Sequence, residues 1–325
     1  MVQQYFKQTV SNDVYTASAP GSMMLFGEHA VLRGKQAIVA AVNKRIHVTL
    51  VPSTNNLISI SDAYLGTITQ SLDKLSVQEP FTYVLQAIML LQQQIPTGFN
   101  LNITPEFGSI GLGSSAAVTV ATIAVLNQWL NLHLTAEQIF NLSKTVVLQI
   151  QGFGSGADIC ASIYGGVLAF NLVEDIPIIR QLPTVPMLTV IYCGYKTATA
   201  KVIALVNSAE LQQPAKYSQI FQDLHECSTA AVSAIQQQNW PALKLLCQQH
   251  HKLQQHLGVS DTVLDALVQD LSAQQQIYGA KISGSGLGDC VIGFGQLSQP
   301  VFIANNAATQ FTANIATQGL TNANN

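Results

Sequence analysis

Glycine-rich segments and one aspartate carry the residue types from which a site for a phosphorylated ligand can be built. The most informative segment, residues 105–117, reads PEFGSIGLGSSAA and lies between a predicted strand and a predicted helix. Glycines let a backbone approach a ligand, and the free N–H groups at a helix start attract an anion. We expect the serines to cap this helix. The residues predicted to cradle phosphate are Gly111, Leu112, Gly113, Ser114, Ser115 and Ala116.

A carboxylate follows a second glycine-rich loop. Residues 152–156 read GFGSG, and Asp158 stands at the start of the next predicted helix. An aspartate there can stabilise the helix dipole by about 0.3 to 1 kcal/mol. It can instead take a proton from a substrate, an effect worth about 10² to 10⁴ in rate. An aspartate at this position would be unremarkable as a helix-stabilising residue, so the rest of the sequence must decide between the two roles.

Two further glycine segments extend this pattern. Residues 19–34 read APGSMMLFGEHAVLRG, and residues 281–290 read KISGSGLGDC. In this order the three segments resemble the motifs of the GHMP kinase superfamily of small-molecule kinases. The resemblance covers nearly the whole chain. It implies a two-domain α+β fold, with an N-terminal domain like domain 2 of ribosomal protein S5 and a C-terminal ferredoxin-like domain. It also implies ATP between the domains, with its phosphates on the middle segment.

The activity that this resemblance implies is transfer of the γ-phosphoryl group of ATP to an alcohol, with Mg²⁺ as the cofactor. Asp158 then matches the catalytic aspartate of the superfamily. The hydroxyl of Ser115, or that of Ser114, would reach the metal ion.

The acceptor is suggested by two phrases that resemble mevalonate kinases, LFGEHAVL at 25–32 and HLGVS at 256–260. The phrase GSGAD at 154–158 and the Gly-Asp-Cys ending of the third segment are more similar to phosphomevalonate kinases. We expect the acceptor to be the primary hydroxyl of mevalonate, a step in making isoprenoid precursors. Phosphomevalonate kinase, a sugar kinase and a non-catalytic metabolite-binding relative are the alternatives.

The acceptor pocket implied by the resemblance draws residues from three parts of the chain. The Glu-His pair after the first glycines would lie close to the substrate, although such a pair is often structural. The loop YKTAT at 195–199 would cover the substrate, and its lysine would meet the substrate carboxylate, unless the loop is only a solvated turn. The predicted substrate-binding residues are Glu28, His29, Lys196, Thr199, Gly284 and Ser285.

Two positions depart from the mevalonate kinase pattern. Ser22 stands where those kinases carry a lysine that pairs with the catalytic aspartate. Val147 stands where many of them carry a metal-binding glutamate. Another cation, such as Lys196 or Lys201, or the metal ion must then stabilise the ionised aspartate.

Composition excludes several classes of partner. The chain has 325 residues, 14 Lys+Arg against 17 Asp+Glu and a formal net charge of -3, so it lacks the basic surface of a nucleic-acid-binding protein. Its most apolar stretch, 116–132, is interrupted by threonine and asparagine and predicts a buried helix, not a membrane span. The N-terminal residues have no apolar run after their lysine, so we expect no cleaved secretory signal, and the five cysteines are scattered. We therefore expect a cytoplasmic protein that acts on a small molecule, with a homodimer as one arrangement.

The organisation of the chain follows from its prolines and periodicity. The proline-rich stretch 173–186 predicts a linker between an N-terminal domain (1–176) and a C-terminal domain (177–325). We expect helices at 81–94, 114–131 and 136–149, the last opened by a capping box at Thr135 and Gln138. Several further helices follow between 201 and 276. We expect their histidines, His225, His250, His251 and His256, to lie at the surface.

Overall fold

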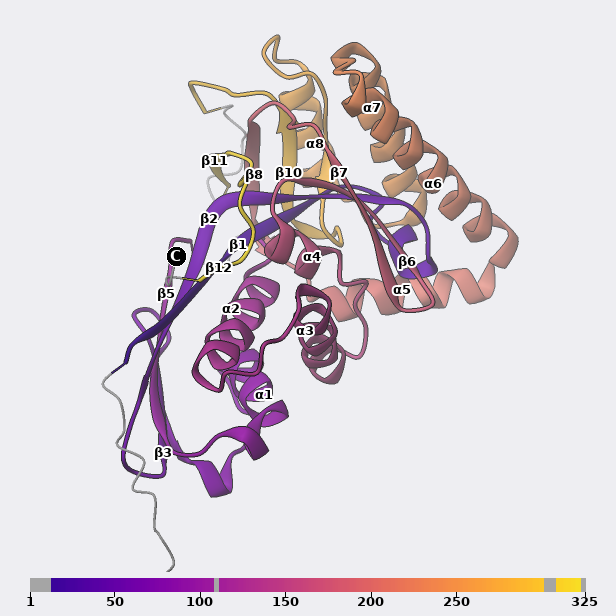
Figure 1. Cartoon of the computed structure of the whole chain (residues 1–325). Helices are drawn as coiled ribbons and strands as arrows, with labels where there is room; N and C mark the ends of the chain where they lie inside the picture. Colours follow the sequence, from indigo (N-terminus) through magenta and orange to yellow (C-terminus); the bar gives the residue numbers. More distant parts are fainter. Residues whose placement is uncertain (1–12, 108–110, 301–307, 323–325) are drawn as a thin grey trace, which may run out of the picture.

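Two β-sheets with helices packed on them organise the residues that the computed structural model describes, which are 13–107, 111–300 and 308–322 (Figure 1). Within these residues the larger sheet has eight strands and the smaller has four. The predicted α+β class is confirmed. None of the helices in the described ranges is long and apolar enough to cross a membrane.

The larger sheet is built around two long antiparallel strands at its centre. Its path runs β12-β1-β2-β5-β3-β4, and a hairpin of β6 and β7 joins it through β2. All pairs are antiparallel except β3 with β5. Its strands are β1 (Tyr15–Phe26), β2 (Ala37–Pro52), β3 (Leu57–Asp62), β4 (Gly66–Ser71), β5 (Phe99–Pro105), β6 (Val167–Val173), β7 (Ile176–Leu182) and β12 (Thr321–Asn322).

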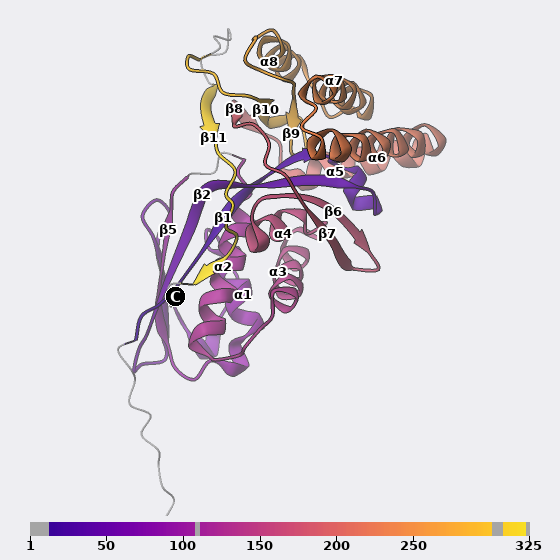
Figure 2. The same ribbon diagram turned by 45° about the horizontal axis from the view of Figure 1, so that its top comes forward.

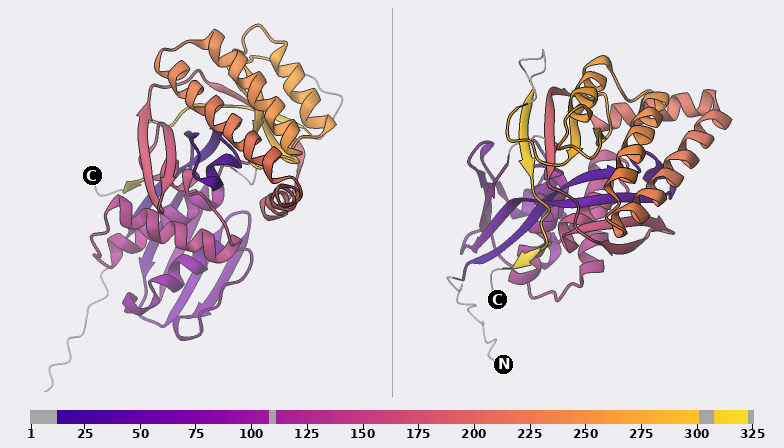
Figure 3. Two further views of the ribbon diagram at one scale, coloured as in Figure 1. Left: turned by 90° about the vertical axis from the view of Figure 1, so that its right-hand side faces the viewer. Right: turned by 90° about the horizontal axis from the view of Figure 1, so that it is seen from above.

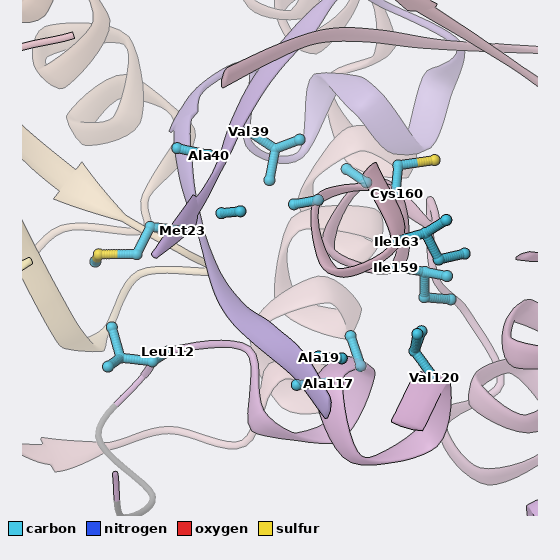
Figure 4. Packing of buried hydrophobic residues seen from close by; sticks show 14 of the residues in the cluster. Ala19, Met23, Val39, Ala40, Leu112, Ala117, Val120, Ile159, Cys160 and Ile163 are labelled. Atoms are coloured by element: carbon cyan, nitrogen blue, oxygen red, sulfur yellow. The ribbon is translucent and has the colours of Figure 1, made fainter. Parts of the chain in front are cut away.

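Helices cover one face of this sheet (Figure 1). Helix α2 is buried almost all round, since it packs on β1 and β2 and is surrounded by α1, α3 and α4. Its small and β-branched side chains allow this close packing on every side. Figure 4 shows Ala117 and Val120 of α2 and Ile159 and Ile163 of α4 in this packing. The helices are α1 (Thr82–Leu90), α2 (Ser114–Trp129), α3 (Ala136–Gln151) and α4 (Ala157–Tyr164), and the short 3₁₀ helices are η1 (Ala30–Arg33), η2 (Leu72–Lys74) and η3 (Gln92–Gln94).

The capping box that opens α3 is confirmed. Thr135 accepts a hydrogen bond from the backbone N–H of Gln138, and the Gln138 side chain accepts one from the N–H of Thr135. At its other end α3 stops at Gly152, which adopts the left-handed conformation. This stop leads into the loop that precedes Asp158.

The smaller sheet has the strand order β11-β8-β10-β9, and each neighbouring pair is antiparallel. In chain order this is 4-1-3-2, as the ferredoxin-like prediction requires. Three of its helices, α6 to α8, lie side by side (Figures 2 and 3). The elements are β8 (Leu188–Lys196), α5 (Thr199–Gln212), α6 (Pro214–Gln236), α7 (Trp240–Leu257), α8 (Thr262–Ser272), β9 (Ala280–Ser283), β10 (Gly288–Phe294) and β11 (Thr309–Ala313).

The predicted linker at 173–186 is wrong, because residues 173–182 form the end of β6, a turn and β7. Glu174 and Asp175 form the tight turn of the β6–β7 hairpin, with φ of 48° and 66°. Pro177 fits β7 because this strand lies at a sheet edge, where a missing N–H is tolerated. Only residues 183–187 connect the two sheets here. The domain boundary at 176/177 stays a prediction, and strand pairing assigns both β7 and β12 to the larger sheet.

Candidate active site

One cavity of about 480 Å³ lies where the two sheets meet. The ends of β1 and β8, the starts of α2, α4 and α5, and the loop between β9 and β10 all contribute to its wall. Every residue that the sequence predicted for the site lines this cavity, namely Asp158, the six residues 111–116, and Glu28, His29, Lys196, Thr199, Gly284 and Ser285.

The start of α2 offers unpaired backbone donors to this cavity. Gly113 is the N-cap, with φ of 61°, and no side chain caps the helix. The first backbone bond within the helix runs from Ala117 N–H to Gly113 O at 3.2 Å. The prediction that the serines cap α2 is therefore wrong, because Ser114 and Ser115 lie inside its first turn. Their hydroxyls and the N–H groups before Ala117 are left for a ligand, as an anion site requires.

Close packing demands the glycine at the N-cap. A Cβ at Gly113 would collide with the hydroxyl oxygen of Ser22 on β1. Residues 108–110 of the predicted phosphate segment lie outside the described residues. In the described part, Gly111 also has a positive φ, 74°.

Asp158 lies in the first turn of α4, beside Ser22. The Ser22 hydroxyl donates a hydrogen bond to Asp158 Oδ1 at 2.9 Å. Burial raises the pKa of Asp158 above its ordinary value, and the nearby Asp289 carboxylate adds to this rise. The Ser22 hydrogen bond and the positive charge of Lys196 act in the opposite direction. Ser22 is thus the neutral partner of the carboxylate at the position where the resemblance noted in the sequence implies a lysine.

Lys196, at the end of β8, forms an ion pair that the sequence did not predict. Its Nζ lies 2.9 Å from Oδ2 of Asp289, in the Gly-Asp-Cys ending of the third glycine segment. Asp289 is 7% exposed and lines the cavity. The sequence feature that could have identified Asp289 as a site residue is the Gly-Asp-Cys ending, where a charged residue interrupts a glycine segment.

Glu28, in the turn after β1, is buried against a lysine. Lys281 Nζ lies 2.5 Å from Glu28 Oε1, and the two residues are 0% and 3% exposed. Lys281 also donates to the carbonyl of Ile282. Burial raises the pKa of Glu28, and the ammonium of Lys281 opposes this rise.

His250 completes this buried cluster, and the prediction that it lies at the surface is wrong. It is 0% exposed because α7 packs this face against β9 and the turn after β1. Its Nε2 accepts a hydrogen bond from Gly27 N–H at 3.0 Å, and Glu28 Oε2 lies 3.3 Å from the same nitrogen. Burial lowers the pKa of His250 well below its usual value, so the ring is neutral and this contact is no ion pair. His251 is buried as well, whereas His256 is exposed.

His29 ties the turn after β1 to the third glycine segment. Its Nε2 donates to the carbonyl oxygen of Ser285 at 2.8 Å, and burial lowers the pKa of His29 to about 4. Ser283 makes a second tie, since its hydroxyl donates to Met24 O at 2.8 Å. Glu28 and His29 thus line the cavity while their side chains also fix its walls.

The cavity fits a magnesium ion held mainly by oxygens that are not from protein. Val147 lines it with an apolar side chain, as the departure noted in the sequence implies. Among the described residues no cluster of three histidines, cysteines or carboxylates is suited to a metal ion. Magnesium keeps several waters and phosphate oxygens, and needs only one or two protein ligands. The hydroxyl of Ser115, which lines the cavity, can supply one of them.

Comparison with known proteins agrees with this geometry. The model described as GHMP kinases N terminal domain matches residues 82–166, and that described as GHMP kinases C terminal matches residues 231–313. Mevalonate kinase from Pyrococcus abyssi is 32% identical over 295 residues, 85% of this chain and 87% of the relative. Mevalonate kinase from Archaeoglobus fulgidus is 34% identical over 288 residues, 87% of this chain and 93% of the relative.

A solved structure shares the fold over almost its full length. The crystal structure of the Methanococcus jannaschii mevalonate kinase superposes with a TM-score of 0.76 at 23% identity, covering 94% of this chain and 98% of that one. The chain therefore belongs to the GHMP kinases. It is an ATP-dependent kinase of the mevalonate kinase-like type, with a small molecule as its substrate.

Proposed function

We propose that this kinase transfers the γ-phosphoryl group of ATP to the primary hydroxyl of mevalonate, with Mg²⁺ as cofactor. The observation that carries the proposal is the meeting, in one cavity, of the uncapped start of α2 with the Ser22–Asp158 pair. The acceptor is supported by the names of the relatives that match most of the chain.

The charge of the cavity favours mevalonate over phosphomevalonate. Lys196 is the one lysine or arginine among its described lining residues, and it is already paired with Asp289. A phosphorylated acceptor would bring a second strongly anionic group and would call for additional cations. The cavity therefore suits an acceptor whose reacting end is an uncharged alcohol.

The residues of the cavity have distinct tasks in this proposal. The N–H groups of residues 114–116 bind phosphate oxygens at the positive end of α2. Asp158 accepts the proton of the attacking hydroxyl, and its raised pKa makes it a better base near neutral pH. The hydroxyl of Ser115 would hold the metal ion. When bound, Mg²⁺ supplies neutralisation of the charge on the phosphates.

A substrate panel tests the proposal. Purified protein is assayed for ADP release with mevalonate, phosphomevalonate and galactose, each with and without Mg²⁺. We expect turnover with mevalonate, dependent on Mg²⁺, and a kcat/KM for it at least about tenfold above that for the other acceptors. A preference for phosphomevalonate or galactose would overturn the choice of acceptor while leaving the kinase activity in place. The cytoplasmic location and the homodimer stay predictions.

A further inference from the structure

Asp289 has a backbone conformation that few residues other than glycine adopt. Its φ is 69°, in the left-handed region. The pairing of β10 with β8 is irregular at this point, since Gly288 pairs with Lys196 but Cys290 pairs with Tyr192. Such irregularities re-aim side chains and are frequent next to active sites. A left-handed non-glycine residue stores strain, which persists where the surroundings hold it in place.

The carboxylate of Asp289 joins two parts of the cavity wall. Its Oδ2 lies 2.9 Å from Lys196 Nζ. Its Oδ1 faces Gly111 so closely that a Cβ at Gly111 would collide with it. Since one oxygen contacts the predicted phosphate cradle and the other bonds the lysine, the ammonium is held beside the cradle.

The charges around this pair define what it can do. A carboxylate pressed against a phosphate cradle repels a polyphosphate unless a cation neutralises it. Lys196 provides that cation, and Asp289 raises its pKa, so it stays charged. The Lys196 side chain is 44% exposed and open to a ligand, whereas that of Asp289 is 10% exposed. Carboxylates orient phosphate-binding lysines in the same way in protein kinases.

We propose that Asp289 is a positioning residue that holds Lys196 beside the start of α2, where Lys196 binds the transferring phosphoryl group of ATP. The proposal replaces the expectation that Lys196 meets the carboxylate of the acceptor. It rests on the kinase activity and does not depend on mevalonate as the acceptor.

Nucleotide binding without any acceptor tests the proposal. Affinities for a non-hydrolysable ATP analogue and for ADP, each with Mg²⁺, are measured by titration for the wild type, Lys196→Ala, Asp289→Asn and the double variant. We expect each single substitution to weaken the ATP analogue about tenfold, as for a lost charge-assisted hydrogen bond, and ADP by less than about twofold. In the Lys196→Ala background, Asp289→Asn should have no effect or should strengthen binding, because it then removes an unpaired carboxylate.

Three results would overturn the proposal. One is an equal loss from Asp289→Asn in both backgrounds, which would show a role independent of Lys196. Another is tighter binding of the ATP analogue by Asp289→Asn alone. The third is a raised KM for the acceptor in Lys196→Ala with unchanged nucleotide affinities, which would assign Lys196 to the acceptor carboxylate.

Two features keep the test decisive. Lys196 is half-exposed, so Lys196→Ala is read out even if Asp289→Asn fails to fold. Asp175→Asn is the matched control, because its carboxylate, in the turn of the β6–β7 hairpin, pairs with Lys144 of α3 at 2.7 Å outside the cavity lining. We expect this control to change neither nucleotide affinity by more than about twofold.

Discussion

Two carboxylates on the wall of one cavity have different kinds of partner. At the Glu28 centre, defined as Glu28, Lys281 and His250, the ammonium lies 2.5 Å from the carboxylate and the residues are 0 to 3% exposed. At the Asp158 centre, defined as Asp158 and Ser22, the direct partner is a hydroxyl at 2.9 Å. Burial raises the pKa of both carboxylates.

The difference distinguishes a carboxylate that stabilises the fold from one that is suited to act as a base. A directly paired buried carboxylate gains most from staying paired, because losing its partner leaves a charge without solvation. A carboxylate that holds only a hydroxyl can take up a proton and release it again at modest cost. The Glu28 centre therefore fixes the turn after β1 against β9 and α7, and the Asp158 centre is the one that we propose for proton transfer.

Replacing Asp158 tests the second half of this comparison and has the largest expected effect. Asp158→Asn removes the base, so we expect kcat to fall by about 10² to 10⁴ while nucleotide affinity stays nearly unchanged. Steady-state kinetics and a nucleotide titration measure the two quantities. Asp175→Asn, at the exposed carboxylate of the Lys144 pair, serves as control. Full activity of Asp158→Asn would remove this residue from the mechanism.

Removing the lysine of the Glu28 centre tests the first half. Lys281→Met leaves the Glu28 carboxylate buried without its cation, so we expect a loss of about 3 to 5 kcal/mol in the free energy of unfolding, measured in urea. Adding Glu28→Gln should recover part of this loss. Lys196→Met, at the half-exposed pair, should cost far less. A similar loss for both lysine variants would break the distinction between the centres.

Acid should destabilise the protein through His29. The pKa of His29 is lowered to about 4 by burial, against an ordinary value of 6.5. The unfolded chain therefore binds more protons between these values, and stability present above pH 6.5 is lost as the pH falls towards 4, by up to about 3 kcal/mol.

Unfolding in urea at pH 7 and pH 5 measures this effect. His29→Asn should lose less stability over this interval than the wild type. His256→Asn, at an exposed histidine, should lose as much as the wild type. An unchanged pH dependence in His29→Asn would show that other groups cause the acid sensitivity.

The smallest expected effect concerns the hydroxyl at Asp158. Ser22→Ala removes a hydrogen bond that lowers the pKa of Asp158, so the acid limb of the rate profile should move to higher pH. The plateau rate should fall by less than about tenfold, as for one neutral hydrogen bond. Ser22→Lys should move the limb the other way. If neither variant moves it, Ser22 does not set the protonation of Asp158.

Local backbone chemistry explains why so much of the site could be predicted. The cradle at 111–116 and the loop at 284–288 depend on positive φ at glycines, which is written in the residues themselves. Asp158 stands two residues after such a loop, and its predicted role came from the resemblance to the GHMP kinases. The capping box at Thr135 is also local, and it was predicted correctly.

Features that depend on distant contacts could not be predicted. The sequence QQHHK around His250 reads as a polar helix face, and only packing against β9 and Gly27 makes it buried. Asp289 meets a lysine 93 positions earlier in the chain, a pairing set by the register of β10 on β8. Glu174 and Asp175 resembled a linker because a tight hairpin turn uses the same residue types.

The return of the chain to the larger sheet restricts how the cavity can open. After β11 in the smaller sheet, Ile315 bridges to Val42, and β12 then pairs with β1. Arg45 donates to the carbonyl oxygens of Gln318 and Gly319 and holds this return in place (Figure 2). The two sheets are thus joined covalently twice, at 183–187 and after residue 313. Any rotation of one sheet relative to the other that leaves both crossings in place is therefore restricted to rocking about the line between them.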